Sequence, residues 1–174
     1  MIGRKVAMAG GGLYATLRKL PAASVMPLPD GASAADGAAM FVNPMTALGF
    51  VETMRAEGHK ALVHTAAASN LGQMLLRITQ ADGIALVAIV RGPAQAALLR
   101  GQGATHVVDS SAADFREQLI AAIAATGAMI AFDAVGGGRL ASQILDAMEA
   151  AAARGMAAYN RYGSNAMKQV YIYG

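Results

Sequence analysis

The sequence predicts an α/β protein built on a doubly wound parallel sheet. From residue 60 onward, short apolar runs alternate with longer segments of helical periodicity, which is the pattern of repeated strand–helix–strand units. The apolar runs are continuous, as expected of strands that helices cover on both faces. Hydrophobic residues make up 55% of the chain and charged residues 14%. This balance, with many Gly and Ala residues, is typical of such a buried sheet and excludes a disordered chain.

The alternating part predicts five strands and the helices between them. We expect strands at residues 60–65, 84–90, 106–108, 128–132 and 169–173. We expect helices at residues 71–80, 93–100, 112–125 and 139–153. Sheets of this type commonly have six strands, so we expect the domain to be truncated before its last strand.

The first part of the chain predicts a small unit of different character. Two short strands are expected at residues 5–9 and 13–17. The segment 25–31 is expected to be an extended linker, because its two prolines hold the preceding residues out of the helical region. A pair of small strands cannot form a stable sheet alone. We therefore divide the chain into residues 1–32, the remnant of another domain, and residues 33–174, the main domain.

Two helices are expected to lead into the main domain. Residues 33–41 are rich in Ala, and a longer helix is expected from Pro44 to Glu57. Asn43 is the expected N-cap of the longer helix, because Asn caps helices well and proline suits the first helical position. Gly58 is expected to end it.

Charge and cysteine content narrow the function classes. The formal charge is +3, the basic residues are scattered and aromatic residues make up 5%, so no nucleic-acid partner is expected. The chain has no Cys, which excludes disulfides, a thiolate nucleophile and Cys-bound zinc within it. Apolar stretches are broken well short of the roughly 18 residues of a membrane-spanning helix. We expect no membrane partner, no secretory signal and a cytoplasmic location.

The turn between the first strand of the main domain and its helix has the spacing of a dinucleotide-binding motif. Ala67, Ser69 and Gly72 occupy the three positions of a Gly-x-Gly-x-x-Gly fingerprint. Ala and Ser can replace glycine there only if the turn avoids positive φ at their positions. The turn is then expected to lead into a helix whose free N–H groups bind a diphosphate. A strand-to-helix turn without a ligand is the alternative.

The residue at the end of the next strand bears on the choice of cofactor. NAD-binding folds present an acid there to the ribose hydroxyls, whereas this chain has Arg91. A guanidinium can hold the 2′-phosphate of NADPH by paired charge-assisted hydrogen bonds. We therefore expect NADPH, with NADH as the alternative cofactor and a merely solvated Arg91 as the structural alternative.

Several ordered motifs together resemble the medium-chain dehydrogenase/reductase superfamily, above all its zinc-independent quinone oxidoreductase and enoyl reductase branch. They are Ala-Leu-Val-His-Thr-Ala-Ala-Ala-Ser-Asn-Leu-Gly-Gln at 61–73, Ile-Val-Arg at 89–91, Gly-Ala-Thr-His-Val-Val-Asp at 103–109, Phe-Asp-Ala-Val-Gly-Gly at 132–137, Leu-Pro-Asp-Gly at 28–31 and Val-Asn-Pro-Met-Thr-Ala at 42–47. The resemblance implies a Rossmann fold for residues 33–174. It identifies residues 1–32 as the end of a GroES-like catalytic domain that is otherwise missing.

The resemblance also implies which residues bind the cofactor. Thr46 would lie near the nicotinamide, the turn would face the pyrophosphate, and Arg91 would contact the adenosine phosphate. Val135 and Gly136 would line the ribose–nicotinamide side. The full implied set is Thr46, Ala67, Ala68, Ser69, Asn70, Leu71, Gly72, Arg91, Val135 and Gly136. The chain departs from the family in its thinned fingerprint glycines and in Ser110, where some relatives carry a Tyr beside the phosphate.

The implied reaction is hydride transfer from NADPH to an activated alkene or carbonyl of a small molecule. The catalytic residues are unknown. Because most of the substrate domain is missing, the chain alone is expected to bind the cofactor weakly or not at all and to turn over nothing. In the zinc-dependent branch a metal-ligand Cys falls at the position of Val42, so no zinc is expected, with a zinc-dependent alcohol dehydrogenase as an alternative. Relatives often pair through the sheet edge, and an open edge favours association into a homodimer.

The remaining polar residues are expected to have structural roles. Asp133 is expected to cap backbone groups at the end of its strand, and His64 to be a hydrogen-bonded core histidine. A phenol near the C-terminus could protonate an enolate, but packing of the last strand is the expected role of Tyr159, Tyr162, Tyr171 and Tyr173. Two other function classes stay open: a catalytically silent nucleotide-binding or scaffold module, and a methyltransferase, which Arg91 opposes because an acid is usual there.

Overall fold

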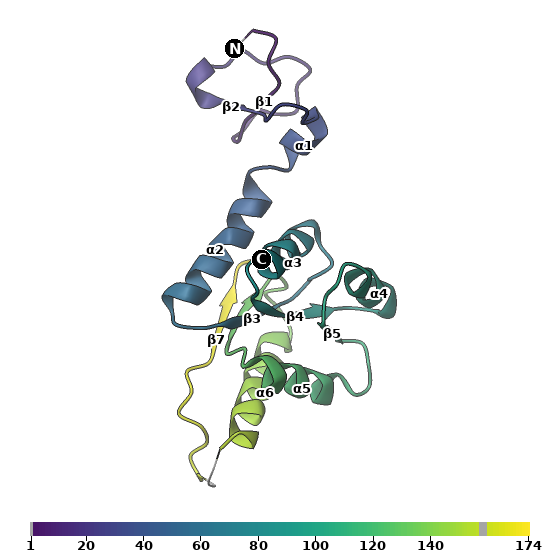
Figure 1. The fold of residues 1–174 in the computed structure, drawn as a ribbon, viewed down its shortest axis with the longest axis vertical. Helices are drawn as coiled ribbons and strands as arrows, with labels where there is room; N and C mark the ends of the chain where they lie inside the picture. The colour runs from purple at the N-terminus through teal and green to yellow at the C-terminus, as the bar shows by residue number, and fades with distance from the viewer. Residues whose placement is uncertain (1, 157–159) are drawn as a thin grey trace. The chain divides into compact units, whose positions relative to one another are not determined.

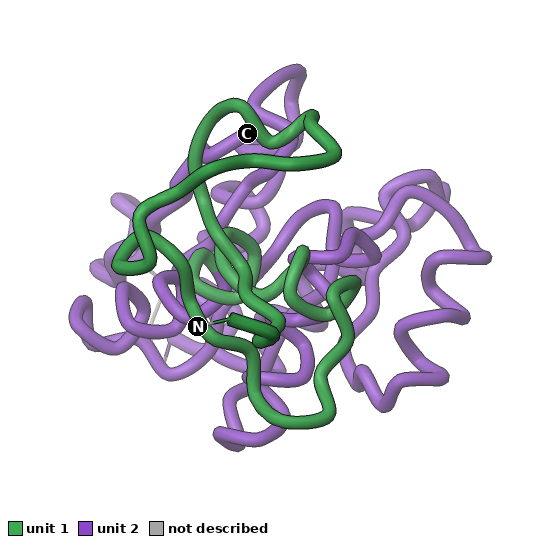
Figure 2. The backbone as a smooth tube through the Cα atoms, turned by 90° about the horizontal axis from the view of Figure 1, so that it is seen from above, with its two compact units in different colours: residues 1–46 green, residues 47–174 purple. Residues whose placement is uncertain are grey.

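The computed structural model describes residues 2–156 and 160–174 (Figure 1), and the chain divides into two compact units (Figure 2). Unit 1 is Met1–Thr46 and unit 2 is Ala47–Gly174. The division falls inside helix α2 (Val42–Ala56), whereas the sequence placed the boundary at residue 33. None of the described helices is long and apolar enough to cross a membrane.

Unit 1 contains a two-stranded antiparallel pairing of β1 (Val6–Ala7) with β2 (Met26–Pro27). The expected strand at 13–17 is wrong, and the partner of β1 comes instead from the segment predicted as a linker. Tyr14 and Leu17 are 108% and 91% exposed, so no apolar surface holds a strand there. Pro27 is tolerated in β2 because a strand with one free edge does not need every N–H.

Two short helical segments complete unit 1, η1 (Ala22–Ser24) and α1 (Ala34–Ala38). A capping box starts α1: the Ser33 hydroxyl accepts from Asp36 N–H, and the Asp36 carboxylate accepts from Ser33 N–H at 2.8 Å. The hydrogen bonds from Ser33 hold the pKa of Asp36 below its usual value. The helix ends at Ala38, three residues before the predicted end.

Unit 2 contains a five-stranded parallel sheet, as predicted. Its strands are β3 (Ala61–His64), β4 (Ala85–Val90), β5 (His106–Asp109), β6 (Ile130–Asp133) and β7 (Gln169–Ile172). The strand order is β5-β4-β3-β6-β7, and every pairing is parallel. The chain therefore builds outward from β3 in one direction and then returns to its other side at β6. This reversal creates the switch point at which doubly wound sheets bind ligands.

The helices of unit 2 lie close to their predicted positions. They are α3 (Asn70–Ala81), α4 (Pro93–Gly101), α5 (Phe115–Thr126) and α6 (Leu140–Arg154), together with most of α2. The N-cap assigned to Asn43 is wrong, because α2 already begins at Val42 and Asn43 lies within its first turn. Helix α5 begins three residues after its predicted start at residue 112. The Asp109 carboxylate accepts from Ser111 N–H at 2.9 Å, so the chain forms a turn before the helix begins.

Both faces of the sheet are covered, which explains the continuous apolar strands. Helices α2, α3 and α4 pack on one face, where Leu62 and Leu86 point. Helices α5 and α6 pack on the other face, where Val63, Val87 and Ile89 point. Successive residues of one strand therefore pack into the cores on opposite faces of the sheet. A polar side chain on either face would need a hydrogen-bond partner.

The connection into β7 is held to α6 by Glu149. Its carboxylate accepts from Ser164 N–H at 2.8 Å and from Ser164 Oγ at 2.9 Å, and lies 2.6 Å from Lys168 Nζ. Lys168, and then the Ser164 hydrogen bonds, lower the pKa of Glu149 to about 2. The carboxylate therefore stays charged in mild acid and keeps the edge strand in place.

Candidate functional site

A cavity of about 480 Å³ lies at the carboxyl edge of the sheet, over the switch point. Its walls come from segments that follow four neighbouring strands, β3, β4, β5 and β6, and from the start of α6. The lining residues are Ala66, Ile89, Arg91, Ser110, Ala134, Val135, Gly137, Arg139, Leu140 and Gln143. Four loops that converge on one cavity make this the strongest candidate for a ligand site in unit 2.

The turn after β3 has the backbone that its alanines require. Ser69 has a φ of −66°, and Ala67 is not among the residues with positive φ. Within the described residues, Ala66 is the one non-glycine residue with positive φ, at 49°. Ala67 is 1% exposed, and its N–H donates to Ile89 C=O at 3.1 Å. This hydrogen bond fixes the turn to the end of β4. The turn thus uses Ala66, outside the fingerprint positions, for its left-handed step.

Gly72 gives the closest approach of helix to turn. A Cβ at Gly72 would lie 2.2 Å from the backbone oxygen of Ala67 and 2.6 Å from its carbonyl carbon. No side chain fits there, because the obstructing atoms are backbone. The third fingerprint position therefore has the packing role that the sequence predicted for it.

The start of α3 is shaped to receive an anion. Ser69 caps the helix, and its Oγ accepts from Gly72 N–H at 3.1 Å. Asn70 and Leu71 are the first two helical residues, whose N–H groups have no partner within the helix. The helix dipole adds a partial positive charge at this end. These groups can bind a diphosphate without any basic side chain.

A buried hydrogen-bond clamp joins the ends of β3 and β6. Thr65 and Asp133 are both 0% exposed, and Thr65 Oγ1 donates to Asp133 Oδ1 at 2.7 Å. The same carboxylate oxygen accepts from Val135 N–H at 3.0 Å, and Ala134 N–H donates to Thr65 Oγ1 at 2.8 Å. Asp133 therefore caps backbone groups as predicted, and it shapes the loop that lines the cavity.

Removing the Thr65 hydroxyl is expected to weaken this clamp. Thr65→Val keeps the side-chain volume but leaves Asp133 Oδ1 and Ala134 N–H short of a buried partner, which costs about 2 kcal/mol of unfolding free energy. Thr65→Ser keeps the hydroxyl and is the matched control. Urea unfolding at neutral pH measures both, and equal stability of the two variants would show that the clamp contributes nothing.

The cavity wall carries positive charge. Arg91 follows β4 and Arg139 immediately precedes α6, and the lining contains no Asp or Glu. Ser110, another polar residue of the lining, donates its hydroxyl to Val90 C=O at 2.9 Å. An anionic ligand suits this wall better than a neutral or cationic one.

His64 is the last residue of β3 and is not among the residues that line the cavity. It is 0% exposed, and its Nε2 is 2.8 Å from the Tyr173 hydroxyl. Its Nδ1 has no hydrogen-bond partner among the described residues. Burial lowers the pKa of His64 to about 4, against an opposing effect of the nearby Asp133 carboxylate. His64 is thus the hydrogen-bonded core histidine that the sequence predicted.

The structure brings together part of the predicted set and adds residues that the sequence reasoning missed. Arg91 and Val135 line the cavity, and Gly136 adjoins the lining residue Gly137. Arg139 and Gln143 also line it and were not predicted. The signal that could have found Arg139 is the run of three glycines before it, which leaves no other side chain between Val135 and the start of the helix.

The other predicted positions are not among the lining residues of this cavity. Thr46 belongs to unit 1, where its hydroxyl donates to Val42 C=O at 2.8 Å, and its place beside the cofactor stays a prediction. Tyr173 contacts His64, and the Tyr171 hydroxyl donates to the Glu57 carboxylate, so both tyrosines hold β7 as expected. Tyr159 lies outside the described residues. Within residues 2–156 and 160–174, no three His, Asp or Glu side chains gather as metal ligands do.

The sequence matches one protein family and two relatives of known type. Residues 70–161 match the family model for zinc-binding dehydrogenases. A mycocerosic acid synthase-like polyketide synthase of Mycobacterium tuberculosis is 32% identical over 132 residues, which are 75% of this chain and 6% of that protein. A quinone oxidoreductase of Pseudomonas aeruginosa is 27% identical over 138 residues, which are 78% of this chain and 42% of that protein.

A solved structure has a similar fold. The crystal structure of a proposed NADPH:quinone reductase from Mesorhizobium loti has 40% sequence identity and a TM-score of 0.65. The match covers 72% of this chain and 36% of that one. This chain therefore spans less than half the length of each of these relatives.

Proposed function

The chain belongs to the zinc-binding dehydrogenase family of the medium-chain dehydrogenase/reductase superfamily, and from this premise we propose that the cavity of unit 2 binds the adenosine half of NADPH. The observation that carries the proposal is Arg91, which lines a cavity without a carboxylate at the end of β4. A free 2′-hydroxyl has no need of a cation there, whereas a 2′-phosphate does.

The residues present fit such a cofactor. The closed packing at Gly72 brings the turn and the start of α3 near the switch point, where the N–H groups of Asn70 and Leu71 are suited to the diphosphate. The adjoining cavity of about 480 Å³ has the size range of nucleotide sites. Val135, which is 49% exposed, offers an apolar surface to a ribose or a base.

The proposed reaction is reduction of an activated carbonyl or alkene in a small-molecule substrate of the whole enzyme. The nicotinamide supplies the hydride when the cofactor is bound. The residues of this chain bind and orient the cofactor through the start of α3 and through Arg91. We propose zinc-independent chemistry, since Val42 stands where the resemblance places a metal-ligand Cys.

Arg91→Ala tests the cofactor assignment. Loss of a charge-assisted contact is expected to weaken NADPH binding about 10- to 100-fold and to leave NADH binding unchanged. Calorimetric titration of the full chain with each cofactor measures both affinities. Arg77→Ala removes an exposed arginine of α3 and is the matched control. Equal affinity of the wild type for the two cofactors would remove the argument from Arg91.

Quinone reduction separates the reductase from a catalytically silent nucleotide-binding module. We propose that the full-length enzyme consumes NADPH when a quinone is added, while this chain alone binds the cofactor without turnover. Full-length protein that binds NADPH yet reduces no quinone or enone would favour the silent module. Binding of S-adenosylmethionine in place of either nicotinamide cofactor would instead indicate a methyltransferase.

A further inference from the structure

Two arginines of unit 2 line the same cavity, and the guanidinium groups of both have no partner among the residues that the structure describes. The described ion pairs use Arg55, Arg116 and Arg154, and Arg100 donates to Val107 C=O. Neither guanidinium of the pair Arg91 and Arg139 donates to any acceptor within the described part of the chain. A protein that leaves two cations free beside one cavity is complementary to an anion with more than one charge.

Arg139 is directed to this cavity by the backbone before it. Gly136, Gly137 and Gly138 carry no side chains, so Arg139 offers the first long side chain after Val135. Gly136 and Gly138 have φ of 64° and 70°, a conformation that other residues rarely adopt.

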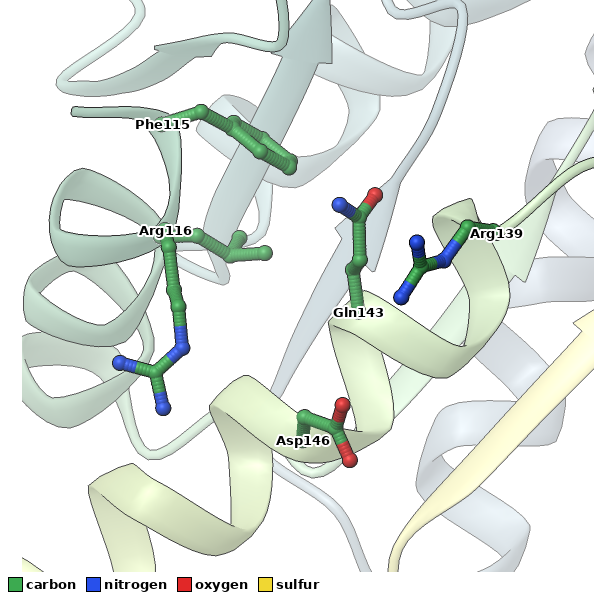
Figure 3. Close-up of a pocket in the computed structure, with 6 residues that line it drawn as sticks. Phe115, Arg116, Arg139, Gln143 and Asp146 are labelled. Carbon is green, nitrogen blue, oxygen red and sulfur yellow. The ribbon is translucent and has the colours of Figure 1, made fainter. Parts of the chain in front are cut away.

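A second, smaller cavity of about 220 Å³ adjoins the first. Figure 3 shows Arg139 and Gln143 projecting from the start of α6, across from Phe115 and Arg116 of α5. Arg139 and Gln143 line both cavities. Asp146 lines only the smaller cavity and forms no ion pair with Arg139 among the described residues. The larger cavity, which has no carboxylate, is therefore the one suited to an anion.

We propose that Arg139 is a second specificity-determining residue for the 2′-phosphate, together with Arg91, an inference that rests on the proposed NADPH site. A phosphate monoester carries about −1.5 to −2 charges at neutral pH, which one guanidinium neutralises only in part. Arg91 approaches from the end of β4 and Arg139 from the start of α6. Gln143, one turn further along α6, adds an amide that can meet the base or the ribose.

Nucleotide fragments isolate this contact from the rest of the cofactor. Adenosine 2′,5′-bisphosphate and adenosine 5′-monophosphate differ only in the 2′-phosphate, so the ratio of their dissociation constants reports recognition of that group. Arg139→Ala is expected to reduce the ratio about 10-fold, through weaker binding of the bisphosphate alone. Arg91→Ala is expected to do the same, and the double variant is expected to abolish the preference. Calorimetry on the full chain measures each value, with thermal unfolding as the check on folding.

The outcomes distinguish the inference from the proposed function. If Arg139→Ala keeps the wild-type ratio, as Arg77→Ala should, while Arg91→Ala lowers it, the inference is overturned and the NADPH site stands. If both fragments lose affinity equally in Arg139→Ala, the residue contacts something other than the 2′-phosphate and the inference fails. If the wild type shows no preference for the bisphosphate, the NADPH assignment and this inference fall together. Arg139→Lys, which keeps the charge but not the paired geometry, should retain part of the preference.

Discussion

Gly72→Ala is expected to destabilise unit 2 by about 3 kcal/mol and to abolish cofactor binding. The added Cβ would lie 2.2 Å from the oxygen of Ala67 and 2.7 Å from its Cα, so the first turn of α3 must move away from the β3 turn. That movement separates the N–H groups of Asn70 and Leu71 from the cavity. Urea unfolding and calorimetric titration with NADPH measure the two effects.

Gly49→Ala is the matched control for this substitution. Gly49 also lies within a helix, α2, but a Cβ there meets nothing within 4 Å and the residue is exposed. Alanine is the better helix former, so Gly49→Ala should stabilise the chain by up to about 1 kcal/mol and leave binding intact. A Gly72→Ala variant as stable as Gly49→Ala would refute the close packing of α3 on the turn.

Acidification is expected to remove about 3 kcal/mol of stability through His64 alone. Burial depresses the pKa of His64 from 6.5 to about 4, so the folded chain keeps the ring neutral while the unfolded chain binds a proton. The unfolded state is therefore favoured as pH falls. The contribution is fully present above pH 6.5 and is lost between pH 6.5 and about pH 4.

His64→Phe should remove this pH dependence. Phenylalanine keeps an aromatic ring beside those of Phe50 and Tyr173, whose centroids lie 5.8 and 6.0 Å from that of His64, and it cannot bind a proton. Across the same pH window, the His64→Phe variant should lose about 3 kcal/mol less free energy of unfolding than the wild type. Urea unfolding at a series of pH values measures the difference, with His106→Gln as the control for loss of one histidine. Parallel curves for wild type and His64→Phe would contradict the burial argument.

The central predicted strands of unit 2, β3, β4 and β6, were correct because both of their faces are buried. In β4, Leu86 and Ala88 enter one core while Val87 and Ile89 enter the other, so the strand reads as an unbroken apolar run. The same pattern failed at residues 13–17, where Leu13 and Leu17 are 47% and 91% exposed. Local apolar content does not make a strand without a partner strand and a core to cover it.

The site was predictable to the extent that its residues lie next to one another in the sequence. The spacing of Ala67, Ser69 and Gly72 predicted the turn, because cap and glycine act on neighbouring backbone. The left-handed step at Ala66 was not predicted, since alanine gives no signal of positive φ. Arg139 was missed because its cavity forms only when the ends of β4 and β6 are brought to the same edge of the sheet.

The sequence by itself determined the alternation of strands and helices, the family motifs and the turn that leads into α3, because each depends on contacts within a few residues. Only the tertiary structure decided that β1 pairs with β2, that Thr65 clamps Asp133, and that Arg91 and Arg139 share one cavity free of carboxylates. Those features join residues about 20 to 70 positions apart. Their proximity follows from the order of strands in the sheet, which no local pattern encodes.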